Sequence, residues 1–131
     1  MPKLTDSQRQ MLEGKNLIHL ATICKDGGPS VSPVWVDLEG DLIRINSAEG
    51  RLKVRNMRRD PRVGLSLVPE ENAYRTLSIR GTVVEMTHEG ADEHIDSLSQ
   101  KYLGVTPYAF RTEGEQRVLI RIRPDIIAGM G

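Results

Sequence analysis

The residues best suited to chemistry lie in a short basic segment, residues 51–62, "RLKVRNMRRDPR". The segment contains one acid, Asp60, and six of the chain's 18 lysines and arginines: Arg51, Lys53, Arg55, Arg58, Arg59 and Arg62. A cluster of this kind either binds an anion or forms the solvated face of a surface helix. Because the six charges do not fall on one helical stripe, part of the cluster serves solvation alone.

The start of this segment has the pattern of a phosphate-binding site. Asn46 and Ser47 follow an apolar strand pattern, and Gly50 precedes the first turn of an expected helix. Backbone N–H groups at a helix N-terminus point outward and carry a partial positive charge. Arg51 and Lys53 would add full charges there, and Ser47 a hydroxyl donor. Gly50 has no side chain, so an anion can approach the backbone closely.

A second candidate site is the segment "SVSPVWVDL", residues 30–38. Pro33 has no N–H to give to a sheet, so we expect it at an edge strand or a bulge. A flat aromatic cofactor could lie along such an irregular backbone, whose free polar groups would read its edge. Trp35 is the only tryptophan in the chain. It suits either this role or that of a large core residue.

Composition argues against several classes of protein. Eighteen basic and 18 acidic residues give no net charge, and five aromatic residues offer little stacking surface, so we expect no nucleic-acid partner. No apolar run approaches the ~20 residues of a membrane helix, and the N-terminus lacks a signal-peptide pattern. Cys24 is the single cysteine, which excludes an intramolecular disulfide. We therefore expect a cytoplasmic protein without a membrane partner.

Hydrophobic periodicity predicts a mainly β chain with residues 1–131 forming one domain. Helices are expected over residues 5–15, 51–60 and 88–104, with Gly14 and Gly104 ending the first and last in the left-handed conformation. Gly81 indicates a bulge. The expected strands, of which the last segment forms a pair, are residues 17–25, 30–38, 42–46, 62–68, 74–87 and 116–130. Six or seven antiparallel strands joined by tight turns are typical of a barrel or sandwich.

The segment "HEGADEHID", residues 88–96, contains two histidines and four acids. A metal site on a helix needs ligands three or four residues apart that face one another, a pattern this segment meets only in part. We interpret it as a solvated helix start with acids in the first turn, which the helix dipole favours. No metal site is expected.

Taken in order, these segments resemble the pyridoxamine 5′-phosphate oxidase-like superfamily of FMN-binding split barrels. The resemblance is closer to the branch that uses the deazaflavin coenzyme F420. It rests on an ordered set of short motifs: "LAT", "DGGPSVSPVW", "NS", "GRLK", "NMRRDPRV" and "IRIRPDII". It implies a six- to seven-stranded antiparallel split β-barrel that forms a homodimer, with cofactor sites at the interface. The implied reaction is hydride transfer from reduced F420 to an unsaturated small-molecule acceptor.

The resemblance also implies which residues bind the cofactor. The phosphate would be held by Ser47, Arg51 and Lys53, with Asn46 and Asn56 nearby. The ring system would be flanked by Ser32, Pro33, Val34 and Trp35. Arg55 and Arg58 would be placed to meet the oligoglutamate tail of F420. No obligatory catalytic side chain follows, and the proton donor is left open between solvent, Tyr74 and another polar residue.

Alternatives to this function remain open at the level of sequence. FMN presents the same kind of tricyclic ring and phosphate as F420, so an FMN-dependent oxidoreductase of the same fold is one alternative. A non-enzymatic flavin-, deazaflavin- or haem-binding protein is another. The C-terminal segment "RPDIIAGMG" lacks the tryptophan and paired arginines that recognise pyridoxal phosphate in the vitamin-phosphate oxidases. This difference argues against pyridoxamine phosphate as the substrate.

Overall fold

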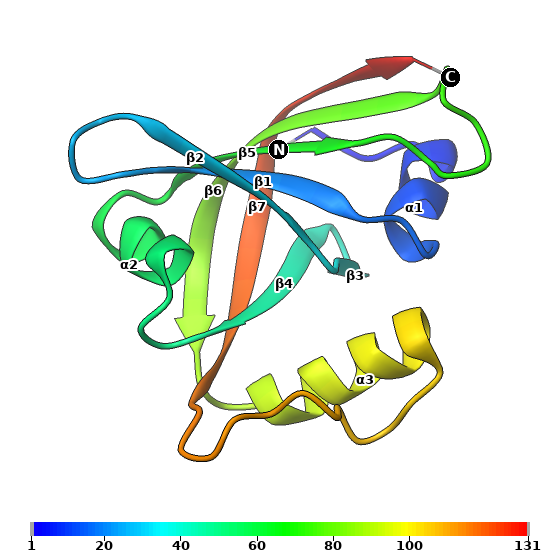
Figure 1. Ribbon diagram of the computed structural model, residues 1–131. Helices are drawn as coiled ribbons and strands as arrows, with labels where there is room; N and C mark the ends of the chain where they lie inside the picture. The colour runs from blue at the N-terminus through cyan, green and yellow to red at the C-terminus, as the bar shows by residue number, and fades with distance from the viewer. Residues whose placement is uncertain (1, 131) are drawn as a thin grey trace.

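A computed structural model describes residues 2–130 and shows a seven-stranded antiparallel sheet with three helices (Figure 1). The order of strands in the sheet is β2-β1-β5-β6-β7-β4-β3. The elements are α1 (Asp6–Glu13), β1 (Ile18–Ile23), β2 (Pro29–Val34), β3 (Asp37–Glu39), β4 (Leu42–Ala48), α2 (Leu52–Arg59), β5 (Arg62–Leu67), β6 (Thr76–Thr87), α3 (Ala91–Leu103) and β7 (Arg117–Met130). The expected mainly β, split-barrel architecture is confirmed.

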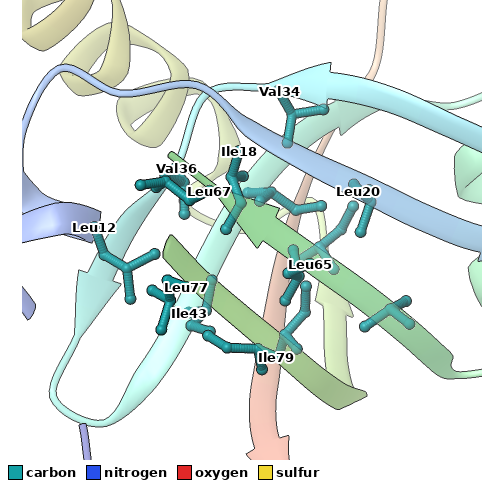
Figure 2. Close-up of a cluster of buried hydrophobic side chains, with 14 of the residues drawn as sticks. Leu12, Ile18, Leu20, Val34, Val36, Ile43, Leu65, Leu67, Leu77 and Ile79 are labelled. Carbon is teal, nitrogen blue, oxygen red and sulfur yellow. The ribbon is translucent and has the colours of Figure 1, made fainter. Parts of the chain in front are cut away.

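The core lies inside the curl of this sheet, where alternate strand residues meet (Figure 2). In β5, Val63, Leu65 and Leu67 are buried while the residues between them are not, as period-2 alternation predicts. Leu12 of α1 and Met57 of α2 close the core from the two helices. Each fully buried side chain of this size contributes about 1.5–3 kcal/mol, so the helices are held mainly by packing.

The first helix begins as expected and ends differently. Thr5 Oγ1 accepts the N–H of Gln8, and Gln8 Oε1 accepts the N–H of Thr5, which forms a capping box. Gly14, however, is extended (φ −73°, ψ 172°), so the prediction of a left-handed residue is wrong. The Asn16 side chain donates to the carbonyl of Met11, and this bond satisfies a helix-end carbonyl that a left-handed glycine usually serves.

Two strand predictions are also wrong, because the two halves of one segment pair with different strands and most of the other segment pairs with the single strand β6. Residues 30–38 form two strands: β2 pairs with β1, and β3 pairs with β4 at the opposite end of the sheet order. The chain crosses between them at Trp35 and Val36. Residues 116–130, expected to be a strand pair, form one long strand whose register shifts opposite Gly81, at the expected bulge.

The longest helix, α3, lies beside β4 and the start of β7 (Figure 1). Ala91, Ile95 and Leu98 are buried at helical spacing, and Gly104 ends the helix in the left-handed conformation (φ 69°), as expected. Within residues 2–130, no helix has the length and apolar character needed to span a membrane.

Replacing Gly81 with alanine should lower the free energy of unfolding by about 1–3 kcal/mol. A Cβ at this position would lie 2.8 Å from Ile122 Cγ2 and 3.0 Å from the carbonyl oxygen of Arg123. The β6–β7 ladder would have to shift to relieve these contacts. Urea denaturation of the purified variant and the unmodified protein measures the difference.

Gly64→Ala is the matched control on the neighbouring strand. Its Cβ would meet the Ala21 Cβ at 3.6 Å, which is an ordinary contact. The free energy of unfolding should change little or rise by up to about 1 kcal/mol, because alanine restricts the unfolded chain. Equal losses in the two variants would contradict the steric account of Gly81.

Candidate functional site

A pocket of about 210 Å³ lies where the β2–β3 crossover, the start of α2, α3 and the start of β7 meet. Its lining combines apolar and aromatic side chains with three cations: Leu17, Pro33, Val34, Trp35, Asn46, Arg51, Lys53, Ile95, Leu98, Tyr108 and Arg117. Six of the nine residues predicted from sequence are therefore brought together here: Pro33, Val34, Trp35, Asn46, Arg51 and Lys53. The two sequence candidates, the basic segment and the proline-tryptophan segment, share one pocket.

The pocket carries an excess of positive charge. Arg117 pairs with Glu115 at 2.7 Å, and Arg51 lies 3.5 Å from the same carboxylate. Lys53 has no carboxylate within ion-pair distance in the described part of the chain. Burial lowers the pKa of Lys53, and the charge of Arg51 lowers it further. Two of the three pocket cations thus share one carboxylate, and the third has none in range among the described residues, an arrangement that favours a bound anion.

The other charges of the basic segment are mostly engaged within the protein. Arg58 pairs with Glu49 at 2.5 Å, and Arg62 pairs with Asp60 at 2.7 Å. Arg59 donates to the carbonyl of Ile23 and to a side-chain oxygen on its own helix. These three arginines hold loops and strand ends, whereas Arg51 and Lys53 at the start of α2 line the pocket.

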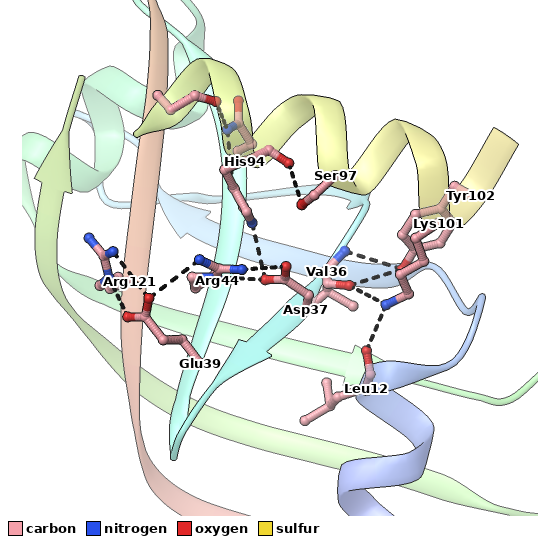
Figure 3. Close-up of polar contacts among 12 residues, drawn as sticks. Leu12, Val36, Asp37, Glu39, Arg44, His94, Ser97, Lys101, Tyr102 and Arg121 are labelled. Atoms are coloured by element: carbon pink, nitrogen blue, oxygen red, sulfur yellow. Dashed lines mark hydrogen bonds and ion pairs between the residues drawn. The ribbon is translucent and has the colours of Figure 1, made fainter. Parts of the chain in front are cut away.

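Asn46 is held in the pocket by partners on both sides of its amide. Its nitrogen donates to the carbonyl of Ala91 and approaches His94 Nδ1 at 3.1 Å, while its oxygen accepts from Arg117 Nε at 2.9 Å. Because His94 Nδ1 accepts this bond, His94 Nε2 carries the proton and donates to Asp37 at 3.1 Å (Figure 3). The orientation of Arg117 is fixed through Asn46.

The histidine in this network corrects the sequence interpretation of residues 88–96. The His94 side chain is 1% exposed, so this part of the segment is buried rather than solvated. It lies against Asp37, which Arg44 binds through two nitrogens at 2.9 and 2.7 Å (Figure 3). Burial raises the pKa of Asp37, but the hydrogen bonds from His94 and Arg44 outweigh burial and hold it below its usual value.

Three predicted residues lie outside the pocket lining. Ser32 is on β2 opposite Leu20. Ser47 is 1% exposed, and its hydroxyl is buried without a hydrogen-bond partner among the described residues. Asn56 donates to Thr22 and to Cys24 Sγ, which ties α2 to β1. The roles of these three residues toward a cofactor stay predictions.

Trp35 has both of the roles that the sequence left open, because it packs against other aromatic side chains and also lines the pocket. The indole stacks on Tyr102 at 5.2 Å and meets Tyr108 edge-on at 6.0 Å, while it also lines the pocket. Tyr102 donates to the carbonyl of Asn16, and burial raises its pKa to about 12. Lys101 donates to the carbonyls of Leu12 and Val36, so the end of α3 supports the crossover that carries Trp35 (Figure 3).

Sequence reasoning missed the pocket residues that α3 and β7 supply. Arg117 is 4% exposed and pairs with Ala48 of β4, next to Ser47. Tyr108 lies on the loop between α3 and β7. The one available signal was a charge at the first position of the apolar strand "RVLI". This charge reaches the pocket only because β4 pairs with β7, and residue types alone do not predict that pairing.

A larger groove of about 600 Å³ lies over β1, β5, β6 and β7. Of its charged residues, Arg62 is paired with Asp60, while Asp125 is paired with Arg123 and bonded to Thr82. Its third charged residue, Arg80, has no ion-pair partner among residues 2–130, but the lining contains no aromatic side chain and no cluster of cations like that of the smaller pocket. Size alone does not make it the better candidate for an anionic ligand.

The fold and the pocket define a split-barrel protein with a positively charged site beside an aromatic wall. The pyridoxamine 5′-phosphate oxidase family model matches residues 4–130, and the chain belongs to this family. The family supports an oxidoreductase class for the chain.

Three solved structures show the range of similarity. One named F420 Reductase is 28% identical, with 98% of each chain covered and a TM-score of 0.83. Protein Rv2991 of Mycobacterium tuberculosis is 24% identical, with 96% of this chain and 84% of that chain covered and a TM-score of 0.74. HupZ of Group A Streptococcus is 21% identical, with 97% and 94% covered and a TM-score of 0.71. The last two similarities concern the fold alone.

Lys101→Met should change how stability depends on pH. Burial lowers the pKa of Lys101 to about 8, more than the nearby Asp37 and Glu13 raise it. Between about pH 8 and the usual lysine value the unfolded chain binds more protons at this site than the folded chain, so stability rises with pH there. The free energy of unfolding of the unmodified protein, relative to the variant, should be larger at about pH 10 than at about pH 7.

Urea denaturation of both proteins at the two pH values gives this difference directly, since all other titrating groups are shared. A constant relative stability would show that the pKa of Lys101 is the same in the folded and the unfolded chain. A relative stability that falls toward high pH would show that the two carbonyl contacts raise this pKa.

Proposed function

We propose that the protein is a coenzyme F420-dependent reductase that delivers a hydride to an unsaturated small-molecule acceptor. The observation that carries the proposal is the grouping of Arg51, Lys53 and Arg117 with the aromatic side chains of Trp35 and Tyr108 in one pocket. A cofactor with a phosphate and a flat ring system matches both parts. The solved structure named F420 Reductase, 28% identical over 98% of this chain, supports the choice of F420.

The donor set fits the phosphate of such a cofactor. Arg51 offers a guanidinium at the start of α2, where no side chain caps the helix N-terminus. Lys53 offers an ammonium group without a carboxylate partner in the described chain. Arg117 is held in place by Asn46 and Glu115, so it needs little reorganisation to receive an anion.

The apolar lining fits the ring. Ile95 and Leu98 of α3 and Val34 of β2 lie with Trp35 in the pocket wall. When bound, F420 supplies the hydride, which passes to an electrophilic C=C or C=N of the acceptor. The residues of this chain bind and orient the reactants and exclude water from them. Tyr74 is 85% exposed outside the pocket lining, so solvent is the simplest proton source.

A second copy of the chain completes the site in this proposal. Ligand pockets usually measure about 300–1,000 Å³, and this pocket is about 210 Å³ in one chain. Exposed apolar side chains at the pocket rim, such as Leu17 at 49%, are consistent with cover by a partner. We propose a homodimer that acts in the cytoplasm.

FMN is the alternative cofactor, because it presents the same kind of ring and phosphate and because the family is that of an FMN-type oxidase. Titration of the purified protein with F420 and, in parallel, with FMN distinguishes the two by fluorescence. Tight binding of F420 with weak binding of FMN supports the proposal, and the reverse result favours the flavin enzyme. Reduced cofactor that binds but is never oxidised by enone, imine or quinone acceptors would indicate a carrier.

Arg51→Ala and Lys53→Ala should each weaken cofactor binding by about 1–3 kcal/mol, which is about 5- to 150-fold in Kd. Each change removes one charge-assisted contact to the phosphate. The loss should shrink as salt is added, because partly exposed charges are screened. Fluorescence titration at low and high salt measures both effects.

Arg58→Ala is the matched control from the same helix. Arg58 pairs with Glu49 and does not line the pocket, so the contact with the oligoglutamate tail that the resemblance implied is not assigned to it. Its cofactor affinity should stay within about twofold of the unmodified protein. If all three variants lose affinity equally, binding depends on the general charge of the segment, and the assignment of Arg51 and Lys53 is wrong.

A further inference from the structure

Asp92 and Asp96 of α3 hold the loop between α3 and β7 through polar contacts. Asp96 accepts the backbone N–H of Tyr108 at 2.8 Å and pairs with Arg111 at 2.8 Å. Arg111 also pairs with Asp92 one turn earlier at 2.7 Å. We call the contacts of Asp92, Asp96 and Arg111 the Asp96–Arg111 clamp. They fix the backbone of Tyr108, whose side chain lines the pocket.

The Tyr108 side chain lies between the aromatic part of the pocket, at Trp35, and the cationic part, at Arg117. Its ring meets Trp35 edge-on at 6.0 Å, and the guanidinium of Arg117 lies 5.4 Å from its centre. Tyr108 does not belong to the buried hydrophobic core. The clamp therefore positions a half-exposed aromatic side chain whose neighbours are pocket residues rather than core residues.

We propose that Tyr108 is a specificity-determining residue that forms an aromatic wall for the planar part of a bound ligand. The Asp96–Arg111 clamp is the device that positions it. This inference rests on the proposed function, because it takes the ligand to combine a planar ring with an anionic group. The ring belongs either to the cofactor or to the acceptor, and the ligand's anionic group lies toward Arg117.

The chemistry of the wall follows from the two rings. Trp35 and Tyr108 are nearly perpendicular, with 82° between their planes, so together they form a corner rather than a single surface. A planar ligand that enters this corner meets the face of one ring and the edge of the other, and both geometries are favourable for aromatic groups. A compact anion without a ring gains nothing from Tyr108.

Titration with three ligands tests the proposal in Tyr108→Ala, Tyr108→Phe and the control Tyr74→Ala, which changes an 85% exposed tyrosine. The ligands are F420, FMN and inorganic phosphate, and the reporter is the fluorescence of Trp35, the only tryptophan. Where the ring is that of the cofactor, Tyr108→Ala should weaken binding of the preferred cofactor about 10- to 100-fold. Tyr108→Phe and Tyr74→Ala should stay within about threefold, and phosphate affinity should not change in any variant.

Arg111→Met tests the clamp separately from the wall. It should weaken cofactor binding about 3- to 10-fold, because Tyr108 loses its fixed position. Combining Arg111→Met with Tyr108→Ala should cause no loss beyond that of Tyr108→Ala alone, since the clamp acts only through Tyr108. Additive losses would show that Arg111 acts on the ligand independently and would overturn its positioning role.

The outcomes separate this inference from the proposed function. If the unmodified protein binds neither F420 nor FMN, the proposed function fails. If it binds one of them and Tyr108→Ala changes neither its Kd nor the KM of an acceptor, the aromatic wall is wrong. If Tyr108→Ala leaves the cofactor Kd unchanged but raises the KM of the acceptor about tenfold, the aromatic wall is supported, and the planar ring that it binds is that of the acceptor. Tyr108→Leu replaces Tyr108→Ala if circular dichroism shows that the alanine variant is unfolded.

Discussion

The pairing of β4 with β7 is the contact on which the candidate site depends. It places Arg117 opposite Ala48, three residues before Arg51, although these segments are almost 70 positions apart in the chain. The register is set by Ile43, Ile45 and their partners, which must all face the core. A slip of one residue would turn Asn46 inward and remove it from Arg117. The core thus determines which polar groups reach the pocket.

The helix α3 forms one wall of the pocket beside the sheet. At its start, His94 reaches Asp37 and Asn46, and at its end Lys101 and Tyr102 support the β2–β3 crossover. A helix fastened at both ends holds its apolar face, Ile95 and Leu98, in a fixed position beside Trp35. The same helix carries Asp92 and Asp96, which hold the loop that contains Tyr108. The apolar wall of the pocket and the position of Tyr108 therefore both depend on α3.

Within the basic segment, residues 51–62, some arginines stabilise the fold while other cations are available to bind an anion. Arg58, Arg59 and Arg62 each have protein acceptors that tie α2 to its neighbours. Lys53 has no carboxylate partner in the described chain, and burial already disfavours its charged form. An anion beside Lys53 would relieve that cost, which is why affinity is expected at the start of α2 rather than along its whole length.

The sequence alone determined the mainly β class, the three helices, the bulge at Gly81 and the segment that carries the cations, because these follow from local periodicity and residue type. It also indicated Trp35 beside an irregular strand. It did not reveal that residues 30–38 divide between two ends of the sheet, that His94 is buried, or that Arg117 and Tyr108 line the pocket. Those facts depend on which distant segments pair. Tertiary structure alone decides this, since burial of the whole core selects the register.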